Sequence, residues 1–207
     1  PLNSGPVGYV SQSGGHLNTL LGYAPAFGIG FSKAISIGNS SVMDGTDFLE
    51  YLGTDSETKI IALYLEGVRE GGKLMQLVRE INRVKPVIIW KGGLTDSGAQ
   101  ASSSHTGSLK GDSQVWNAFF RQTGAIQVRS AEELADIIMT LLYLGPLDGS
   151  AAAVLAGGGG SSVAIGDICG EEGIQTPRLT EVSKSKLLQF ISLVNQGIAN
   201  PLDIPEV

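Results

Sequence analysis

The chain has 207 residues, of which 42% are hydrophobic and 16% charged, which is the composition of a globular protein and excludes the fibrous and disordered classes. Its formal net charge is −6 and its lysines and arginines form no cluster, so neither a nucleic acid nor an anionic membrane surface is an expected partner. No apolar run approaches the roughly 20 residues that a helix needs to cross a bilayer, and no spacing of His, Cys, Asp and Glu predicts a metal site.

The single cysteine, Cys169, cannot form a disulfide within the chain, and we expect it to be a buried helix residue. A lone cysteine favours a reducing compartment, and residues 1–6 have neither the basic nor the apolar region of a signal peptide. We therefore expect a cytoplasmic protein, in which residues 1–6 form a linker from an upstream domain.

Short apolar runs alternate with longer amphipathic runs along the first 145 residues, which is the pattern of βαβ units around a parallel sheet. Strands are predicted at 7–10, 31–37, 60–65, 87–90 and 125–128, and helices at 17–26, 46–52, 73–84, 113–122 and 131–144. Local signals support the helix ends: Asp112 is a predicted N-cap, Gly124 follows a last turn, and Ser130 with Glu133 forms a predicted capping box. The prediction is an α/β, flavodoxin-like, three-layer α/β/α domain over residues 1–145.

Residues 145–149 interrupt this pattern with Gly-Pro-Leu-Asp-Gly, a sequence typical of an interdomain linker. A strand at 152–155 and a helix at 161–172 then restart it, and only about one further βα unit fits before Val207. Residues 150–207 are therefore predicted to form the start of a second, similar and incomplete domain.

The strand at 7–10 leads into a turn that suits an anion. Ligands of parallel sheets lie beyond the carboxyl ends of the strands, and a glycine-lined helix start offers free N–H groups and a positive dipole end. Gln12, Ser13, Gly14 and Gly15 are therefore candidate phosphate-binding residues, although a tight β-to-α turn explains the same glycines equally well. For His16, in the first helical turn, a solvated or partly packed ring is favoured over a catalytic role.

The run Gly157–Gly160 repeats this arrangement after the strand at 152–155. A flexible linker is the alternative, but linkers are seldom inserted between an apolar strand and an apolar-periodic helix. Gly159, Gly160 and Ser161 are thus candidates for a second anion-binding helix start. The run matches neither a dinucleotide fingerprint nor a Walker motif.

His105 lies in a polar stretch, Ser-Ser-Ser-His-Thr-Gly-Ser, within a predicted loop over residues 93–111, and loops of this length are commonly functional or disordered.

Glu66 directly follows the apolar strand at 60–65, where a carboxylate can fix the tautomer of an imidazole and make the opposite nitrogen a better nucleophile. A helix cap or an exposed turn is the alternative for Glu66. Lys91 and Asp96 are weaker candidates, since a charged residue past a strand end is usually solvated.

These residues resemble the NDP-forming acyl-CoA synthetases, the family of ADP-forming acetate–CoA ligase and succinyl-CoA synthetase. The resemblance runs in order through nearly the whole chain, in segments 5–15, 38–39, 47–52, 55, 63–67, 85–87, 104–109 and 124–128, and then 157–160 and 200–203.

The resemblance implies a reversible conversion of acyl-CoA, phosphate and ADP into free acid, CoA and ATP, through an acyl phosphate and a phosphohistidine. It assigns the phosphohistidine to His105 and the carboxylate that steadies it to Glu66. Thr106 and Gly107 would contact the phosphoryl group together with the helix starts at Ser13 and Gly157. Coenzyme A, ATP or ADP and Mg²⁺ would be bound mainly by an N-terminal CoA-binding domain and an ATP-grasp domain or subunit, which this sequence lacks.

The resemblance therefore implies a fragment of an acid–thiol ligase. The whole enzyme would act on a carboxylic acid or its acyl-CoA, whereas the isolated fragment would be inactive. Whether the protein forms a homo-oligomer is left open. His16 and Lys110 occupy places where small or apolar residues are expected in the family. Two other hypotheses stay open: a non-catalytic, acyl-CoA-sensing module of a protein acetyltransferase, and a flavodoxin-like interaction domain.

Overall fold

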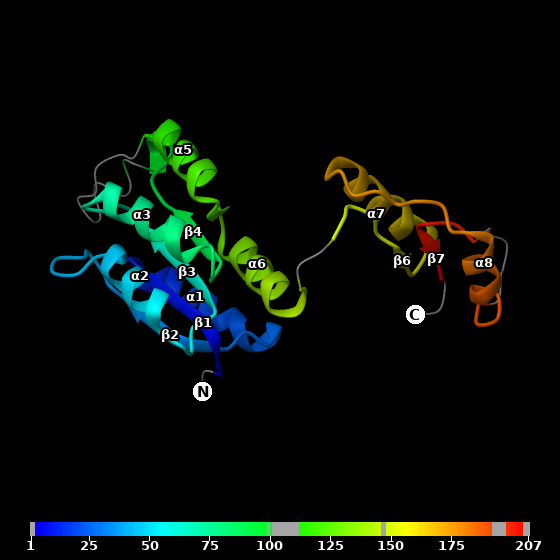
Figure 1. Ribbon diagram of the computed structural model, residues 1–207, viewed down its shortest axis with the longest axis horizontal. Helices are drawn as coiled ribbons and strands as arrows, with labels where there is room; N and C mark the ends of the chain where they lie inside the picture. Colours follow the sequence, from blue (N-terminus) through cyan, green and yellow to red (C-terminus); the bar gives the residue numbers. More distant parts are fainter. Residues whose placement is uncertain (1–2, 99, 101–111, 146–147, 192–197, 205–207) are drawn as a thin grey trace. The chain divides into compact units, whose positions relative to one another are not determined.

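The computed structural model describes residues 3–98, 100, 112–145, 148–191 and 198–204. The chain divides into two compact units, Pro1–Gly145 and Pro146–Val207, and each is described by itself (Figure 1). Among the described residues, no helix is both long and apolar enough to cross a membrane.

The first unit is a five-stranded parallel sheet with the order β2-β1-β3-β4-β5. Its strands are β1 (Ser4–Ser11), β2 (Phe31–Ser36), β3 (Ile60–Leu65), β4 (Val87–Lys91) and β5 (Ile126–Val128). Its helices are α1 (Gly14–Tyr23), the 3₁₀ turn η1 (Ala24–Phe27), α2 (Gly45–Thr54), α3 (Gly71–Ile81), α5 (Ser113–Thr123) and α6 (Ala131–Tyr143). The flavodoxin-like α/β/α prediction is confirmed.

Helices cover both faces of this sheet, and the central strand β3 shows why. Its alternate residues Ile60, Ala62 and Tyr64 pack on the face covered by α1 and α6. The residues between them, Ile61, Leu63 and Leu65, pack against α2, α3 and α5. Because both faces are buried, β3 is apolar at every position, as is typical of a central parallel strand.

Local signals set most of the helix ends. Asp112 caps α5 by accepting the N–H of Gln114 at 2.7 Å, and Gly124 ends this helix in the left-handed conformation with φ 70°. Ser130 accepts the N–H of Glu133 as expected, but the Glu133 carboxylate accepts the N–H of Arg129 rather than that of Ser130. The predicted capping box is therefore only half formed.

The helix predicted at 17–26 ends earlier than expected. It stops at Tyr23, and the chain continues as the 3₁₀ turn η1, which contains Pro25. A proline lacks the N–H that an α-helix needs at this point, so the chain tightens into a 3₁₀ turn.

Two glycines at the edge of the sheet let β1 and β2 approach closely. A Cβ atom on Gly30 would lie 2.4 Å from the carbonyl oxygen of Ser4, and one on Gly5 would lie 2.5 Å from the backbone of Gly30. Neither position therefore tolerates a side chain without moving a strand.

We expect Gly30→Ala to lower the free energy of unfolding by about 1–3 kcal/mol, because the new methyl group overlaps backbone that is fixed by the sheet. Gly22→Ala in α1 is the matched control, since nothing lies within 4 Å of its added Cβ. That change should raise stability by about 0.4–1 kcal/mol through the lower entropy of the unfolded chain. Urea denaturation followed by tryptophan fluorescence measures both, because Trp90 and Trp116 lie in the first unit. Equal effects of the two substitutions would contradict the prediction.

The second unit contains β6 (Leu155–Ala156), α7 (Gly159–Glu171), α8 (Glu181–Leu187) and β7 (Leu202–Asp203), with β6 and β7 paired in parallel. The strand predicted at 152–155 is wrong in position. The N–H of Ala152 bonds to the carbonyl of Gln175, and that of Val154 bonds to the Asn200 side chain, so the pairing of β6 with β7 starts only at Leu155. The helix predicted at 161–172 begins two residues earlier, at Gly159, and Cys169 is buried in it as expected.

Candidate functional site

The carboxyl ends of β1, β3 and β4 are neighbours in the sheet, as the sequence predicted. The strand order reverses between β1 and β3, since the chain continues from β1 to β2 on one side and from β3 to β4 on the other. Ligands of open parallel sheets bind at such a switch point, beyond the carboxyl ends of the strands. Residues 12–15, 66–67 and 91–92 follow these three strand ends.

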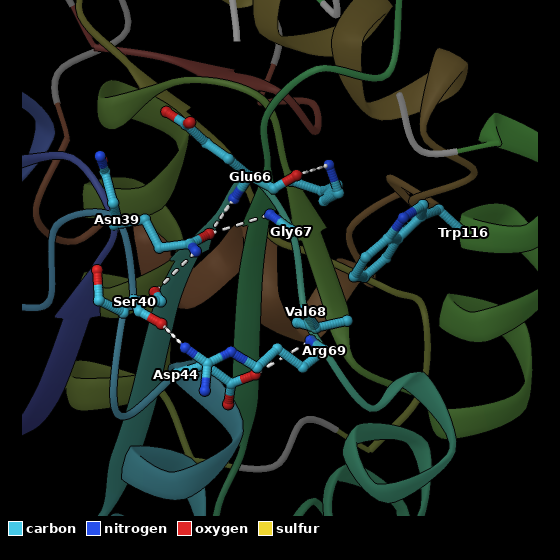
Figure 2. A pocket seen from close by; sticks show the side chains of 11 residues that line it. Asn39, Ser40, Asp44, Glu66, Gly67, Val68, Arg69 and Trp116 are labelled. Carbon is cyan, nitrogen blue, oxygen red and sulfur yellow. Dashed lines mark hydrogen bonds between the residues drawn. The ribbon is translucent and has the colours of Figure 1, made fainter. Parts of the chain in front are cut away.

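Gln12 connects two of these strand ends through its side chain. Its Oε1 accepts the backbone N–H of Glu66, and also that of Gly67 at 3.1 Å, while its Nε2 donates to Oγ of Ser40 at 3.0 Å (Figure 2). The Gln12 side chain thereby fixes the backbone that carries Glu66. This is a positioning role that the sequence did not reveal.

The Glu66 side chain is half-buried and points away from Asp44 and Arg69 in Figure 2. The Tyr64 hydroxyl donates to Oε1 of Glu66 at 3.3 Å. Burial raises the pKa of Tyr64, and the negative charge of Glu66 raises it further, so this phenol remains a donor. The carboxylate is thus oriented by a neighbour on its own strand.

His16 packs against the same region from α1. Its ring centroid lies 4.4 Å from that of Tyr64 and 4.3 Å from that of Trp90, so the prediction of a partly packed imidazole is confirmed. Burial lowers the pKa of His16, and the charge of Glu66 opposes this effect. The net shift favours the neutral form of the imidazole.

The turn after β1 forms a well-defined helix start. Ser13 is the N-cap of α1, with its Oγ accepting the N–H of His16 at 3.2 Å, and its own N–H bonds to Oγ of Ser11 at 3.1 Å. Gly14 and Gly15 are exposed, and their N–H groups have no acceptor among the described residues. These free donors, at the positive end of a helix dipole, suit a bound anion.

The second glycine-rich helix start, in the other unit, already holds a carboxylate. Gly158 has φ 112°, and its N–H donates to Oδ1 of Asp203 at 2.9 Å. Gly159, Gly160 and Ser161, which form the first turn of α7, are exposed. The start of α7 therefore favours negative charge, and an added phosphoryl group would lie close to Asp203.

Lys91, the last residue of β4, differs from its sequence-based expectation. Instead of being solvated it is only 6% exposed, and its Nζ donates to the carbonyl oxygen of Glu66 at 2.8 Å and to that of Gly92. Its ammonium lies 5.3 Å from the centre of the Trp116 ring. Burial lowers the pKa of Lys91 to about 8, and the charge of Glu66 partly opposes this shift.

A cavity of about 390 Å³ opens at this edge, lined by Gln12, Asn39, Ser40, Ser41, Asp44, Glu66, Gly67, Val68, Arg69, Lys91 and Trp116. Part of its lining is a hydrogen-bond network that sequence reasoning missed. The Asp44 carboxylate caps α2 through the N–H of Thr46 at 2.8 Å and accepts the N–H of Arg69 at 3.1 Å. The Arg69 guanidinium donates to the carbonyl oxygens of Ser40 and Val42. Only the Asp-x-x-Asp cap pattern at Asp44 was visible in the sequence.

His105, Thr106 and Gly107, with Lys110, lie outside the described residues. The segment that leads to them leaves the sheet at Gly92, directly after Lys91. It therefore starts at the edge where Gln12, Glu66 and the Ser13 turn lie. Within the described ranges no group of three or more His, Cys, Asp or Glu side chains could hold a metal ion.

The sequence profile of the family described as "Succinyl-CoA ligase like flavodoxin domain" matches residues 4–141. The chain belongs to this family. The matched residues are those of the five-stranded unit, including every strand end at the candidate site.

Several relatives of this chain are named as ADP-forming CoA ligases. The chain is 39% identical over 97% of its length to "Acetate--CoA ligase [ADP-forming] I" of Archaeoglobus fulgidus, of which it covers 29%. It is 35% identical over 97% of its length to "4-hydroxybutyrate--CoA ligase [ADP-forming]" of Nitrosopumilus maritimus, again covering 29% of that protein.

A solved structure is also similar: acetyl-coenzyme A synthetase 1 of Ca. Korarchaeum cryptofilum, determined with phosphate and ADP, matches with a TM-score of 0.84 and 32% identity. It covers the whole of this chain, which in turn spans 45% of that protein. The resemblance to the NDP-forming acyl-CoA synthetases is thereby confirmed, and the chain spans less than half the length of these relatives.

Proposed function

We propose that this chain is the phosphohistidine-carrying part of an ADP-forming acyl-CoA synthetase, with His105 as the residue that takes up the phosphoryl group. One observation carries the proposal: Glu66 is held against the β1–α1 turn, at the edge of the sheet from which the His105 segment departs. The ADP-forming relatives agree with this chemistry.

The proposed reaction has three steps. A phosphate oxygen attacks the thioester carbonyl of an acyl-CoA, the C–S bond breaks, and CoA leaves as a thiol that has gained a proton. A neutral nitrogen of His105 then attacks the phosphorus of the acyl phosphate, the P–O bond breaks, and the free carboxylate leaves. A terminal oxygen of ADP then attacks the phosphorus of the phosphohistidine, the P–N bond breaks, and ATP and the neutral imidazole are released.

Each residue has one task in this scheme. Glu66 accepts one imidazole N–H of His105, fixing the tautomer and stabilising the positive charge that develops on the ring. The free N–H groups of Gly14 and Gly15 bind the phosphoryl oxygens, with Ser13 holding the turn and Gln12 the Glu66 backbone. Thr106 and Gly107 act next to His105, and Gly159, Gly160 and Ser161 form a second binding turn.

Other parts of the enzyme complete the reaction. CoA binds to an N-terminal CoA-binding domain, and ADP binds with Mg²⁺ to an ATP-grasp domain or subunit. The substrate is a small carboxylic acid or its acyl-CoA.

The full-length polypeptide that contains this chain, with its ATP-grasp part, should acquire acid-labile, base-stable label from labelled ATP and Mg²⁺. The same label should appear from acyl-CoA with labelled phosphate, and it should be released as ATP when ADP is added. His105→Ala should abolish the label while tryptophan fluorescence shows an unchanged fold. Normal labelling of the alanine variant would refute the assignment. CoA binding without any phosphorylation would instead support a regulatory, acyl-CoA-sensing module.

A further inference from the structure

Lys91 is a buried cation that the scheme above does not use. Its ammonium donates to two backbone carbonyls, of Glu66 at 2.8 Å and of Gly92, and rests near the face of the Trp116 ring. The residue is only 6% exposed, although it is the last residue of its strand and lines the cavity. Burying an ammonium is costly, so a placement of this kind needs a reason.

The two carbonyls belong to the two chain segments that must meet in phosphoryl transfer. Glu66 follows β3, whereas Gly92 starts the segment that leads to His105. Gln12 holds the N–H of Glu66 and Lys91 holds its carbonyl oxygen, so the peptide groups on both sides of Glu66 are fixed. Removing either contact would loosen the backbone that carries the Glu66 carboxylate.

We propose that Lys91 is a positioning residue of the phosphohistidine site, whose ammonium joins the Glu66 backbone to the start of the His105 segment. This inference rests on the proposed function. Hydrogen bonds from a charged donor are shorter and about twice as strong as those from a neutral one, so the tether depends on the positive charge.

Because the tether depends on the positive charge of Lys91, its strength should depend on pH. The charged groups that line the cavity together with Lys91 are Glu66, which follows β3, and Asp44 and Arg69; among them, Glu66 is the one whose charge acts on Lys91. Carboxylates and guanidinium groups as classes titrate far from pH 8–9.5, whereas burial lowers the pKa of Lys91 to about 8. Above this pH the tether weakens, and phosphoryl transfer should slow.

As pH rises, the stability of the fold should change in the opposite direction to the rate of phosphoryl transfer. The pKa of Lys91 is lower in the folded state than in the unfolded state, so the unfolded chain binds more protons between about pH 8 and pH 10.4. The free energy of unfolding therefore gains a contribution that rises with pH in this range. A slower reaction in a more stable protein is not expected of a residue that only maintains the fold.

Lys85 offers a matched control at the other end of the same strand. Its Nζ donates to the carbonyl oxygens of Leu52 at 2.9 Å and Asp55 at 2.7 Å, and burial lowers its pKa too. Lys85→Met thus removes the same kind of tether at the amino end of β4, away from Glu66.

The experiment compares wild type, Lys91→Met, Lys91→Arg and Lys85→Met in the full-length polypeptide. The rate of labelling of His105 is measured from acyl-CoA with labelled phosphate between pH 7 and pH 9.5, and unfolding in urea is followed in parallel. Lys91→Met should slow labelling about 10- to 100-fold at pH 7, by analogy with the loss of groups that orient the ligands of metal sites. Lys91→Arg should recover part of the rate and remove its decline above pH 8, because arginine keeps its charge. Lys85→Met should label at the wild-type rate.

Labelling of Lys91→Met at the wild-type rate would overturn the inference and leave the proposed function intact. An equal loss in Lys85→Met would show that both lysines act through stability alone and would overturn it too. If Lys91→Met does not fold, the inference is tested by comparing the pH dependence of the labelling rate in wild type and in Lys91→Arg. A decline above pH 8 in Lys91→Arg that equals the wild-type decline would refute the role of the charge. Absence of label from wild type would refute the proposed function itself.

Discussion

Replacement of Glu66 by glutamine should slow phosphorylation of His105 about 100-fold, the upper range for losing a group that orients a reactive imidazole. Glutamine keeps the size of the side chain and its contact with the Tyr64 hydroxyl, but it removes the charge that stabilises the ring when it becomes cationic. The loss should therefore appear in the rate of labelling from acyl-CoA and phosphate, not in the fold.

Single-turnover labelling of the full-length polypeptide measures this effect, and urea denaturation checks the stability. Glu80→Gln is the control, because Glu80 is an exposed residue of α3 whose carboxylate accepts a bond from Gln76 on the same helix. It should label at the wild-type rate. A Glu66→Gln variant with wild-type kinetics would remove Glu66 from the site, even if His105 still carried the phosphoryl group.

Leu63→Ala should lower the free energy of unfolding by about 2–5 kcal/mol, the range for truncating a fully buried leucine. Leu63 is fully buried in β3, the middle strand of the sheet, and it belongs to the core between the sheet and helices α2, α3 and α5. Helices on one side and neighbouring strands on the other limit how far the site can collapse, so a cavity remains.

The urea midpoint of the first unit, followed by tryptophan fluorescence, reports this loss. Val84→Ala is the control, since Val84 is 83% exposed and its truncation should change stability by less than about 0.5 kcal/mol. A midpoint for Leu63→Ala that matches this control would contradict the assignment of Leu63 to the core.

Much of the first unit was predictable because its signals are local or periodic. The apolar run at 60–65 predicted a strand with the bounds that β3 has, and Asp112 and Gly124 marked the two ends of α5. The candidate site was also partly predictable: the rule that parallel strand ends share one edge brought Ser13 and Glu66 together without coordinates.

Prediction failed where a short strand depends on distant partners. The N–H of Val154 bonds to the side chain of Asn200, 46 residues away, so the apolar run at 152–155 forms a strand only at its end. The apolar pattern of one segment does not show that its backbone bonds to the side chain of Asn200 instead of to a neighbouring strand.

The sequence by itself determined the succession of strands and helices along the chain, the parallel sheet and the edge at which the candidate residues collect, since hydrophobic period and chain direction suffice for these. Only the tertiary structure decided the contacts of Gln12 and Lys91. Gln12 bonds to backbone 54 and 55 residues away and Lys91 to backbone 25 residues away. A lysine after a strand is solvated or buried according to whether carbonyls and an aromatic ring surround it, and these come from segments that only folding brings together.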